Sequence, residues 1–140
     1  MKQIYLKQIF TILLLLCCTV ASIQEVEAAD KCGDNAFWTL DETTGPLTIS
    51  GEGELYDYQP SRNNAPWYAN RSIIEEVVIN EGITAVGEYA FYNCTNLTNI
   101  IIPNSVTTIK NFTFTYCSKL TSITIPSNAS TIGNYAFYKC

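Results

Sequence analysis

One segment of this chain is present as a tandem repeat. Residues 91–113 align without a gap on residues 114–136, and ten of the 23 positions are identical. A third copy begins at Phe137 and runs to Cys140, and a degenerate copy at 68–90 precedes the two. Periods of this length are typical of folds in which each unit buries its apolar side chains against the next unit. The repeat therefore favours a stack of similar coils over a single compact core.

The spacing of apolar residues within a copy predicts how each coil runs. Large apolar residues recur at about every third position, except for the step of two from Ile100 to Ile102, which is the spacing of a β-strand. Pro103 and Pro126 should end this strand, because proline cannot donate to a central ladder. The other expected pieces are a second extended segment at Val106–Lys110 and short helical turns at Tyr89–Cys94 and Tyr135–Cys140. The prediction is a β-rich solenoid with a repeat of about 23 residues, short parallel strands and short helical turns.

The residues before the repeats differ in kind. Phe37–Leu40 and Leu47–Leu55 predict two strands joined by a turn at Glu42–Pro46. Such a hairpin would cover the open end of the first coil. We therefore expect an N-terminal β cap at 29–66 and repeats at 67–140, in copies 68–90, 91–113 and 114–136 and a truncated copy 137–140. The alternative role for the aromatic residues of this part is a sugar-stacking platform formed by Tyr56, Tyr58, Trp67 and Tyr68.

Each full copy carries a cysteine at the same place. Cys94, Cys117 and Cys140 occupy one slot of successive coils, so we expect a ladder of buried free thiols. In the degenerate copy, with Tyr68 aligned on Phe91, Arg71 stands in this slot. A disulfide between neighbouring slots is the alternative, with poor geometry for stacked side chains. The spacing of 23 residues does not suit a metal site, and the state of Cys32 is left open.

The first residues resemble a secretion signal. Lys2 and Lys7 precede an apolar run of 13 residues, Ile9–Ala21, which is short for a membrane span. We expect residues 1–28 to be a signal peptide cleaved near Ala28, with cleavage at Ala21 or a retained anchor as the alternatives. The mature chain would then be secreted or displayed on a cell surface, without a membrane span. Five Asn-x-Ser/Thr sequons are candidate N-glycosylation sites in a eukaryotic secretory pathway: Asn70, Asn93, Asn96, Asn111 and Asn128.

Composition argues against catalysis and against nucleic-acid binding. The chain has no histidine, which removes the commonest general base and most zinc sites. Residues 29–90 hold 11 acidic and three basic side chains, a net charge of −8, whereas residues 91–140 hold three lysines and no acid. The acidic pair Glu75 and Glu76 is adjacent on an expected strand, so the two side chains point to opposite faces. We expect no enzyme activity, no cofactor and no nucleic-acid partner.

The outward residues of the expected strands form the candidate binding face. Ile100 and Ile102 should point inward, so their neighbours line a face that suits a partner protein. These outward residues are Glu76, Val78, Asn99, Ile101, Ser122 and Thr124. An uncovered end of such a stack exposes apolar core, which also predicts end-to-end self-association.

Several stretches together resemble a known family. CGDNAFWTL, LTISGEGELYDY, APWY and the repeat FxxCxxLxxIxIPxSVTxIxxxxF are similar to the BspA-like leucine-rich repeat (LRR_5 type) surface proteins of bacteria and parasitic protists. The resemblance implies a leucine-rich-repeat solenoid on a secreted or surface protein, often linked to adhesion to host cells or extracellular matrix, with no catalytic residues and no cofactor.

That resemblance leads to a functional expectation. We expect a non-catalytic binding or adhesion module whose outward face meets a host-cell or matrix protein or glycan. The alternative is a structural spacer or a truncated, non-functional paralogue, because the sequence stops inside its third cysteine-bearing copy, where family members usually run through many repeats.

Overall fold

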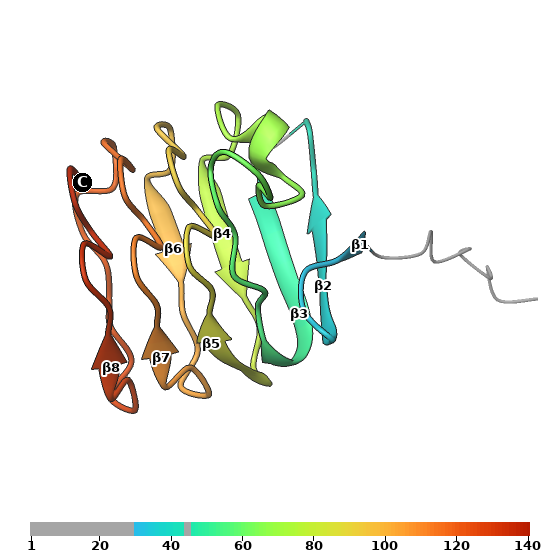
Figure 1. Cartoon of the computed structure of the whole chain (residues 1–140), viewed down its shortest axis with the longest axis vertical. Helices are drawn as coiled ribbons and strands as arrows, with labels where there is room; N and C mark the ends of the chain where they lie inside the picture. The colour runs from blue at the N-terminus through green and yellow to red at the C-terminus, as the bar shows by residue number, and fades with distance from the viewer. Residues whose placement is uncertain (1–29, 44–45) are drawn as a thin grey trace, which may run out of the picture.

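The computed structural model describes residues 30–43 and 46–140, so the expected signal peptide at 1–28 lies outside the described residues. The fold is rich in strands, as predicted, and its repeat copies lie side by side in Figure 1. Among the described residues, the one helical segment is the three-residue 3-10 helix η2 (Tyr68–Asn70). The strands are β1 (Asp30–Lys31), β2 (Asn35–Leu40), β3 (Pro46–Glu54), β4 (Glu76–Ile79), β5 (Ile83–Val86), β6 (Asn99–Ile101), β7 (Thr108–Ile109) and β8 (Thr131–Ile132).

Strand β3 joins the N-terminal part to the repeats. It pairs antiparallel with β2, which in turn pairs antiparallel with β1. Its first half pairs parallel with β4 and its end pairs parallel with β5, so the strand bends from one sheet into the other. Gly51 lies at φ 100° where the strand turns, and a Cβ there would come within 2.1 Å of the Asn35 carbonyl oxygen. This close backbone approach requires glycine.

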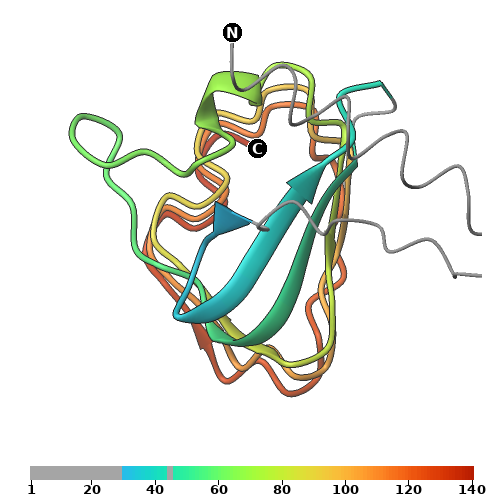
Figure 2. The same ribbon diagram turned by 90° about the vertical axis from the view of Figure 1, so that its right-hand side faces the viewer.

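Parallel pairing between copies has a register of 23 residues. Glu76 pairs with Asn99 in one sheet, and Thr108 pairs with Thr131 in the other. Seen along the stack in Figure 2, the copies lie over one another. Because parallel strands in this register place equivalent residues next to each other, every slot of the repeat becomes a column of neighbouring side chains.

The core runs through the middle of the stacked copies. Its inward residues agree with the predicted spacing, and the rings of Trp67, Phe91, Phe114 and Phe137 form a column with centroids 5.3–5.6 Å apart. Two expected inward residues, Ile102 and Phe112, are half-buried instead. The buried apolar residues of the first full copy are Phe91, Cys94, Leu97, Ile100, Val106 and Ile109.

The predicted helical turns are wrong. Residues 88–93 and their equivalents form hydrogen-bonded turns. Two residues of each turn have a positive φ, in the left-handed region, and this conformation prevents a continuous helix. The backbone N–H groups of Phe91 and Asn93 donate to the Thr113 and Thr115 carbonyls of the next copy, at 2.9 Å each. Bonds between copies therefore replace bonds within a helix. The left-handed residues fall in two slots of the repeat, at φ 55–66°: Tyr89, Phe112 and Tyr135, and Asn93, Tyr116 and Lys139.

The alignment of the degenerate copy also needs correction. Trp67, and not Tyr68, stacks on Phe91, with ring centroids 5.6 Å apart. The strand that follows keeps the 23-residue register, so one extra residue lies between Trp67 and Ile74. The 3-10 helix η2 accommodates this residue. Trp67 is fully buried and its Nε1 donates to the Ala90 carbonyl at 2.8 Å, which ties the degenerate copy to the next one.

Proline shortens the first sheet from copy to copy. Asn80 follows β4, and its N–H donates to the Ile49 carbonyl at 2.9 Å. The equivalent Pro103 has no donor, and β6 is three residues long where β4 has four. The strand expected around Ile123 and Ile125 is not formed. That segment precedes Pro126, which has no N–H to donate to the ladder.

Candidate functional site

The outward face of the first sheet carries a row of small and apolar side chains across four strands. Thr39 on β2 pairs with Thr48 on β3, Thr48 pairs with Val78 on β4, and Val78 pairs with Ile101 on β6. We call these four residues the sheet-face row. Val78 is half-buried, and the Ile101 side chain is 50% exposed. Ile101 is the last residue of β6, and an isoleucine so exposed on a paired strand is available to a partner.

The remaining predicted face residues lie around this row. Asn99 donates from Nδ2 to Glu76 Oε1 at 2.7 Å, so these two side chains satisfy one another. Ser122 and Thr124 are exposed in the second full copy, in the segment that forms no strand. The structure thus brings Glu76, Val78, Asn99 and Ile101 onto neighbouring strands. Sequence reasoning missed Thr39 and Thr48, which the alternation of the two hairpin strands could have revealed.

The cysteines lie in a column of free thiols. Cys94 and Cys117 are buried, and Cys117 Sγ donates to the Phe91 carbonyl at 3.2 Å. Cys140 Sγ makes the equivalent contact with the Phe114 carbonyl at 3.2 Å, although the residue is exposed. Burial raises the pKa of Cys94 to about 12, despite the opposing charge of Arg71. A thiolate is therefore disfavoured in this column, and its role is packing.

Cys32 lies apart from that column in the hairpin. It is a buried free thiol, and burial raises its pKa to about 12 against a backbone hydrogen bond that lowers it. Its carbonyl accepts a hydrogen bond from the buried Tyr58 hydroxyl at 3.3 Å. Within residues 30–43 and 46–140, no group of three or more histidine, cysteine, aspartate or glutamate side chains is placed to hold a metal ion.

The sequons differ in how firmly the structure holds their amide groups. Asn111 is the most constrained: its Nδ2 donates to Glu88 Oε1 and its Oδ1 accepts the Asn134 N–H, both at 2.8 Å. Asn93 lies at φ 60° in a turn. The side-chain amides of the other three sequons each donate one hydrogen bond. Asn70 Nδ2 donates to Glu42 Oε1 at 3.3 Å, Asn96 Nδ2 to the Ser72 carbonyl at 2.6 Å, and Asn128 Nδ2 to the Asn104 carbonyl at 3.1 Å.

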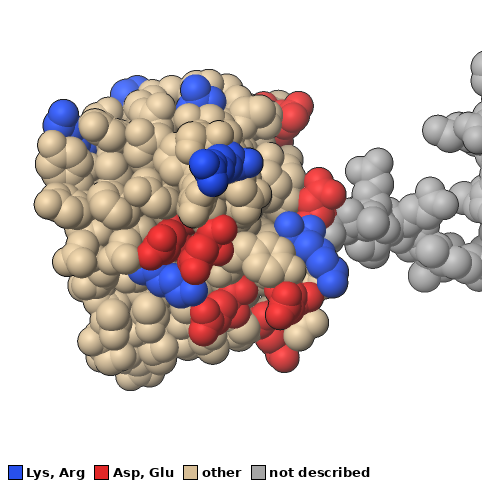
Figure 3. Space-filling model, in the orientation of Figure 1, with Lys and Arg blue, Asp and Glu red and all other residues tan. Residues whose placement is uncertain are grey.

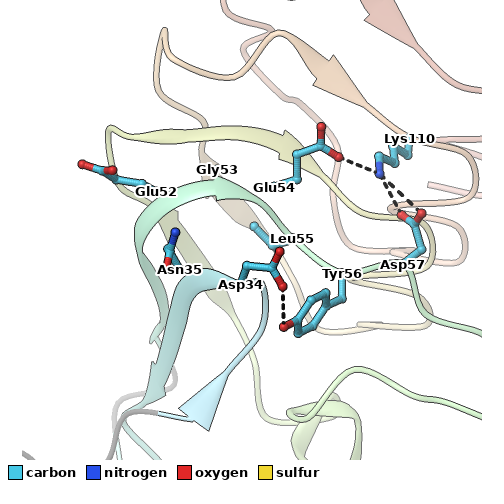
Figure 4. Close-up of a pocket in the computed structure, with 9 residues that line it drawn as sticks. All are labelled: Asp34, Asn35, Glu52, Gly53, Glu54, Leu55, Tyr56, Asp57 and Lys110. Carbon is cyan, nitrogen blue, oxygen red and sulfur yellow. Dashed lines mark hydrogen bonds and ion pairs between the residues drawn. The ribbon is translucent and has the colours of Figure 1, made fainter.

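A cleft of about 430 Å³ lies where the hairpin meets the repeats, and the sequence did not predict it (Figure 4). Lys110 Nζ reaches Glu54 Oε2 at 3.0 Å and Asp57 Oδ1 at 3.2 Å. Burial disfavours the charged Lys110 ammonium, but the hydrogen bonds that it donates to Glu54 and Asp57 outweigh this effect and raise its pKa. The Tyr56 hydroxyl donates to Asp34 Oδ1 at 3.0 Å. The ion pairs of Lys110 with Glu54 and Asp57 fasten the N-terminal part to the first full copy.

The aromatic residues of the N-terminal part do not form a sugar-stacking platform. Tyr58 and Trp67 are buried, and they contact each other edge to face with centroids 6.0 Å apart. Tyr56 is exposed but is bonded to Asp34 across the cleft. The alternative considered for these residues is therefore wrong, since two of its four rings are core.

Comparison with known families decides the classification. A family profile described as "BspA type Leucine rich repeat region (6 copies)" matches residues 64–140. This chain belongs to the BspA-type leucine-rich repeat family. No curated protein matches it in a sequence search.

Two solved leucine-rich repeat proteins resemble this BspA-type chain. One, from Eubacterium ventriosum, is 30% identical, with a TM-score of 0.63 over 77% of this chain and 34% of its own. Another, from Bacteroides ovatus, is 26% identical, with a TM-score of 0.52 over 79% of this chain and 33% of its own. The chain thus spans about a third of the length of these relatives. None of the helices among the described residues has the length and apolar character needed to cross a bilayer.

Proposed function

We propose that this protein is a non-catalytic binding module of a secreted or cell-surface protein. In this proposal residues 67–140 form a leucine-rich-repeat solenoid, residues 29–66 cap its first coil, and residues 1–28 are a cleaved signal peptide. The 23-residue register of the parallel strands and the antiparallel pairing of β2 with β3 support the solenoid and the cap. Membership of the family supports the surface location.

The binding surface proposed is the outward face of the first sheet. One observation carries this assignment: the sheet-face row crosses β2, β3, β4 and β6 in register and leaves Ile101 half-exposed. A flat row of small side chains ending in an exposed isoleucine suits the surface of a host-cell or extracellular-matrix protein or glycan. Interfaces below roughly 1,000 Å² are usually weak, so many copies on one surface would supply avidity.

The test compares two variants of equal added charge. Ile101→Lys combined with Thr124→Lys changes the proposed face, whereas Thr84→Lys combined with Ser118→Lys changes exposed positions away from it. Each protein is coupled to fluorescent beads, and bead retention is measured on cultured epithelial cells and on immobilised extracellular matrix. We expect the face variant to lose at least nine-tenths of the retention, and the control variant to keep it. Equal retention of both variants would remove the face assignment.

A structural spacer is the second candidate function. The Glu76–Asn99 hydrogen bond supports it, because side chains on the same face satisfy one another without a ligand. A spacer predicts that neither variant changes retention and that only the number of repeats matters. End-to-end self-association belongs to the same proposal, and sedimentation of the purified chain over a range of concentrations measures it.

A further inference from the structure

A second surface on the repeats combines tyrosine rings with two cations. Tyr92 and Tyr116 contact edge to face with centroids 5.7 Å apart, and Tyr116 and Tyr138 do so at 5.9 Å. Tyr68 and Tyr92 line the same narrow crevice. Successive copies lie about 4.8 Å apart, so the surface extends roughly 14 Å across the stack. We call it the tyrosine–cation band, made of Tyr68, Arg71, Tyr92, Tyr116, Tyr138 and Lys139.

The two cations of the band rest on its rings. The Arg71 guanidinium carbon lies 4.2 Å from the Tyr68 ring centroid. Lys139 Nζ lies 5.1 Å from the Tyr116 centroid and 5.4 Å from the Tyr138 centroid. These distances are those of cation–π contacts.

Neither cation of the band is neutralised by a carboxylate. Within the described part of the chain, the ion pairs are those of Lys110 with Glu54 and Asp57. Residues 91–140 contain no aspartate or glutamate at all. In Figure 3 basic side chains gather along the upper rim of the repeats, and acidic ones gather below it and toward the N-terminal strands. The band therefore presents positive charge that an anionic group can meet.

The hydroxyl groups of the band are free as well. Among the described residues, the hydroxyls of Tyr56 and Tyr58 are bonded, to Asp34 and to the Cys32 carbonyl. The four tyrosines of the band make no hydrogen bond through their hydroxyls to the described residues, and the Tyr138 side chain is 45% exposed. These hydroxyls are thus donors and acceptors that remain available to a ligand.

We infer that the tyrosine–cation band binds an acidic oligosaccharide, with carboxylate or sulfate groups on its sugar rings. Tyrosine rings offer an apolar face to the C–H side of a pyranose and a hydroxyl to its polar edge. Arg71 and Lys139 offer charge-assisted hydrogen bonds to the acidic groups. An apolar peptide would desolvate both cations and the free hydroxyls without compensation. This surface does not involve the sheet-face row, so the inference does not rest on the proposed function.

Nucleic acid is the other anion that stacks on aromatic rings. The chain disfavours it, because residues 29–90 carry a net charge of −8 and would repel a long polyanion that extends beyond the band. An oligosaccharide of a few sugars can stay within the repeats. A single-stranded oligonucleotide therefore serves as the competing probe.

The experiment measures the affinity of the whole chain for a heparin hexasaccharide, with lactose and a twelve-nucleotide oligothymidine as comparison ligands. Lys139→Met removes one cation of the band, and Lys119→Met removes an exposed lysine outside it. Tyr138→Leu removes an exposed ring, and Lys139→Arg restores the charge. The three positions that these variants change are all exposed, so the circular dichroism of each variant should match that of the parent.

We expect the hexasaccharide to bind, and Lys139→Met and Tyr138→Leu each to weaken it at least tenfold. Lys119→Met should change the affinity less than twofold, Lys139→Arg should bind as the parent does, and lactose should not bind. An equal loss in Lys119→Met would mean unspecific charge attraction and would overturn the inference. So would the absence of hexasaccharide binding, or tighter binding of oligothymidine that Lys139→Met abolishes.

Discussion

Phe114 is the residue whose removal tests the stacked core most sharply. Its side chain is fully buried between Phe91 and Phe137, with centroids 5.3 Å away on each side and interplanar angles of 8° and 4°. Replacing a core phenylalanine by alanine costs about 3–5 kcal/mol, and the loss of two stacked neighbours places this site in the upper part of that range. We expect Phe114→Ala to lower the free energy of unfolding by about 4 kcal/mol, a large share of the roughly 5–15 kcal/mol of a typical domain.

Urea unfolding followed by tryptophan fluorescence measures this loss, because Trp67 is buried in the same column. The matched control is Phe137→Ala. Phe137 is half-buried and has one stacked ring on its described side, so its removal should cost about 1–2 kcal/mol. The urea m-value should stay the same in both variants. A loss below about 1.5 kcal/mol for Phe114→Ala, or an equal loss in both variants, would refute the column of stacked rings.

Three further predictions concern side chains of the repeat slots. The folded pKa of Cys94, about 12, is above its ordinary value of 9.0, so the stability that its protonation contributes is present below pH 9 and is lost as pH rises toward 12. Cys94→Ala should therefore make the fall of unfolding free energy above pH 9 shallower, by up to about 1.4 kcal/mol per pH unit. Asn111→Asp should lower the free energy of unfolding by about 1–3 kcal/mol, since it removes the donor to Glu88 and puts two carboxylates together. An unchanged melting temperature would contradict the hydrogen bond between Asn111 and Glu88. Expression in a glycosylating host should leave Asn111 unmodified in peptide mapping while Asn128, which is exposed, carries any glycan that is added.

The repeat period carried most of the information about the fold. A 23-residue identity predicts parallel pairing in that register, and the observed pairs Glu76 with Asn99 and Thr108 with Thr131 follow it. The inward slots were also predictable, because a bulky residue such as Phe91 or Leu97 recurs wherever the coil turns toward its axis. Two of the four residues in the sheet-face row were found in the same way.

The features that sequence reasoning missed depend on backbone geometry or on distant contacts. Tyrosine, phenylalanine and lysine have no preference for the left-handed conformation, so the sequence gives no sign of it, and the turns at Tyr89 and Tyr116 were predicted as helical. The extra residue after Trp67 is invisible to an alignment without gaps. Lys110 is 53 residues from Asp57, and no local pattern connects the two. Tertiary context decided each of these features.

The most direct measurement for this account is the distance between equivalent outward slots. Spin labels at Val78 and Ile101, in a Cys140→Ser background, would lie on directly paired residues of β4 and β6. We expect strong dipolar broadening for this pair, because neighbouring parallel strands are about 4.8 Å apart. A pair at Thr84 and Ile101, on different sheets, should show much weaker broadening. Broadening in the second pair but not in the first would contradict the 23-residue register and the binding face built on it.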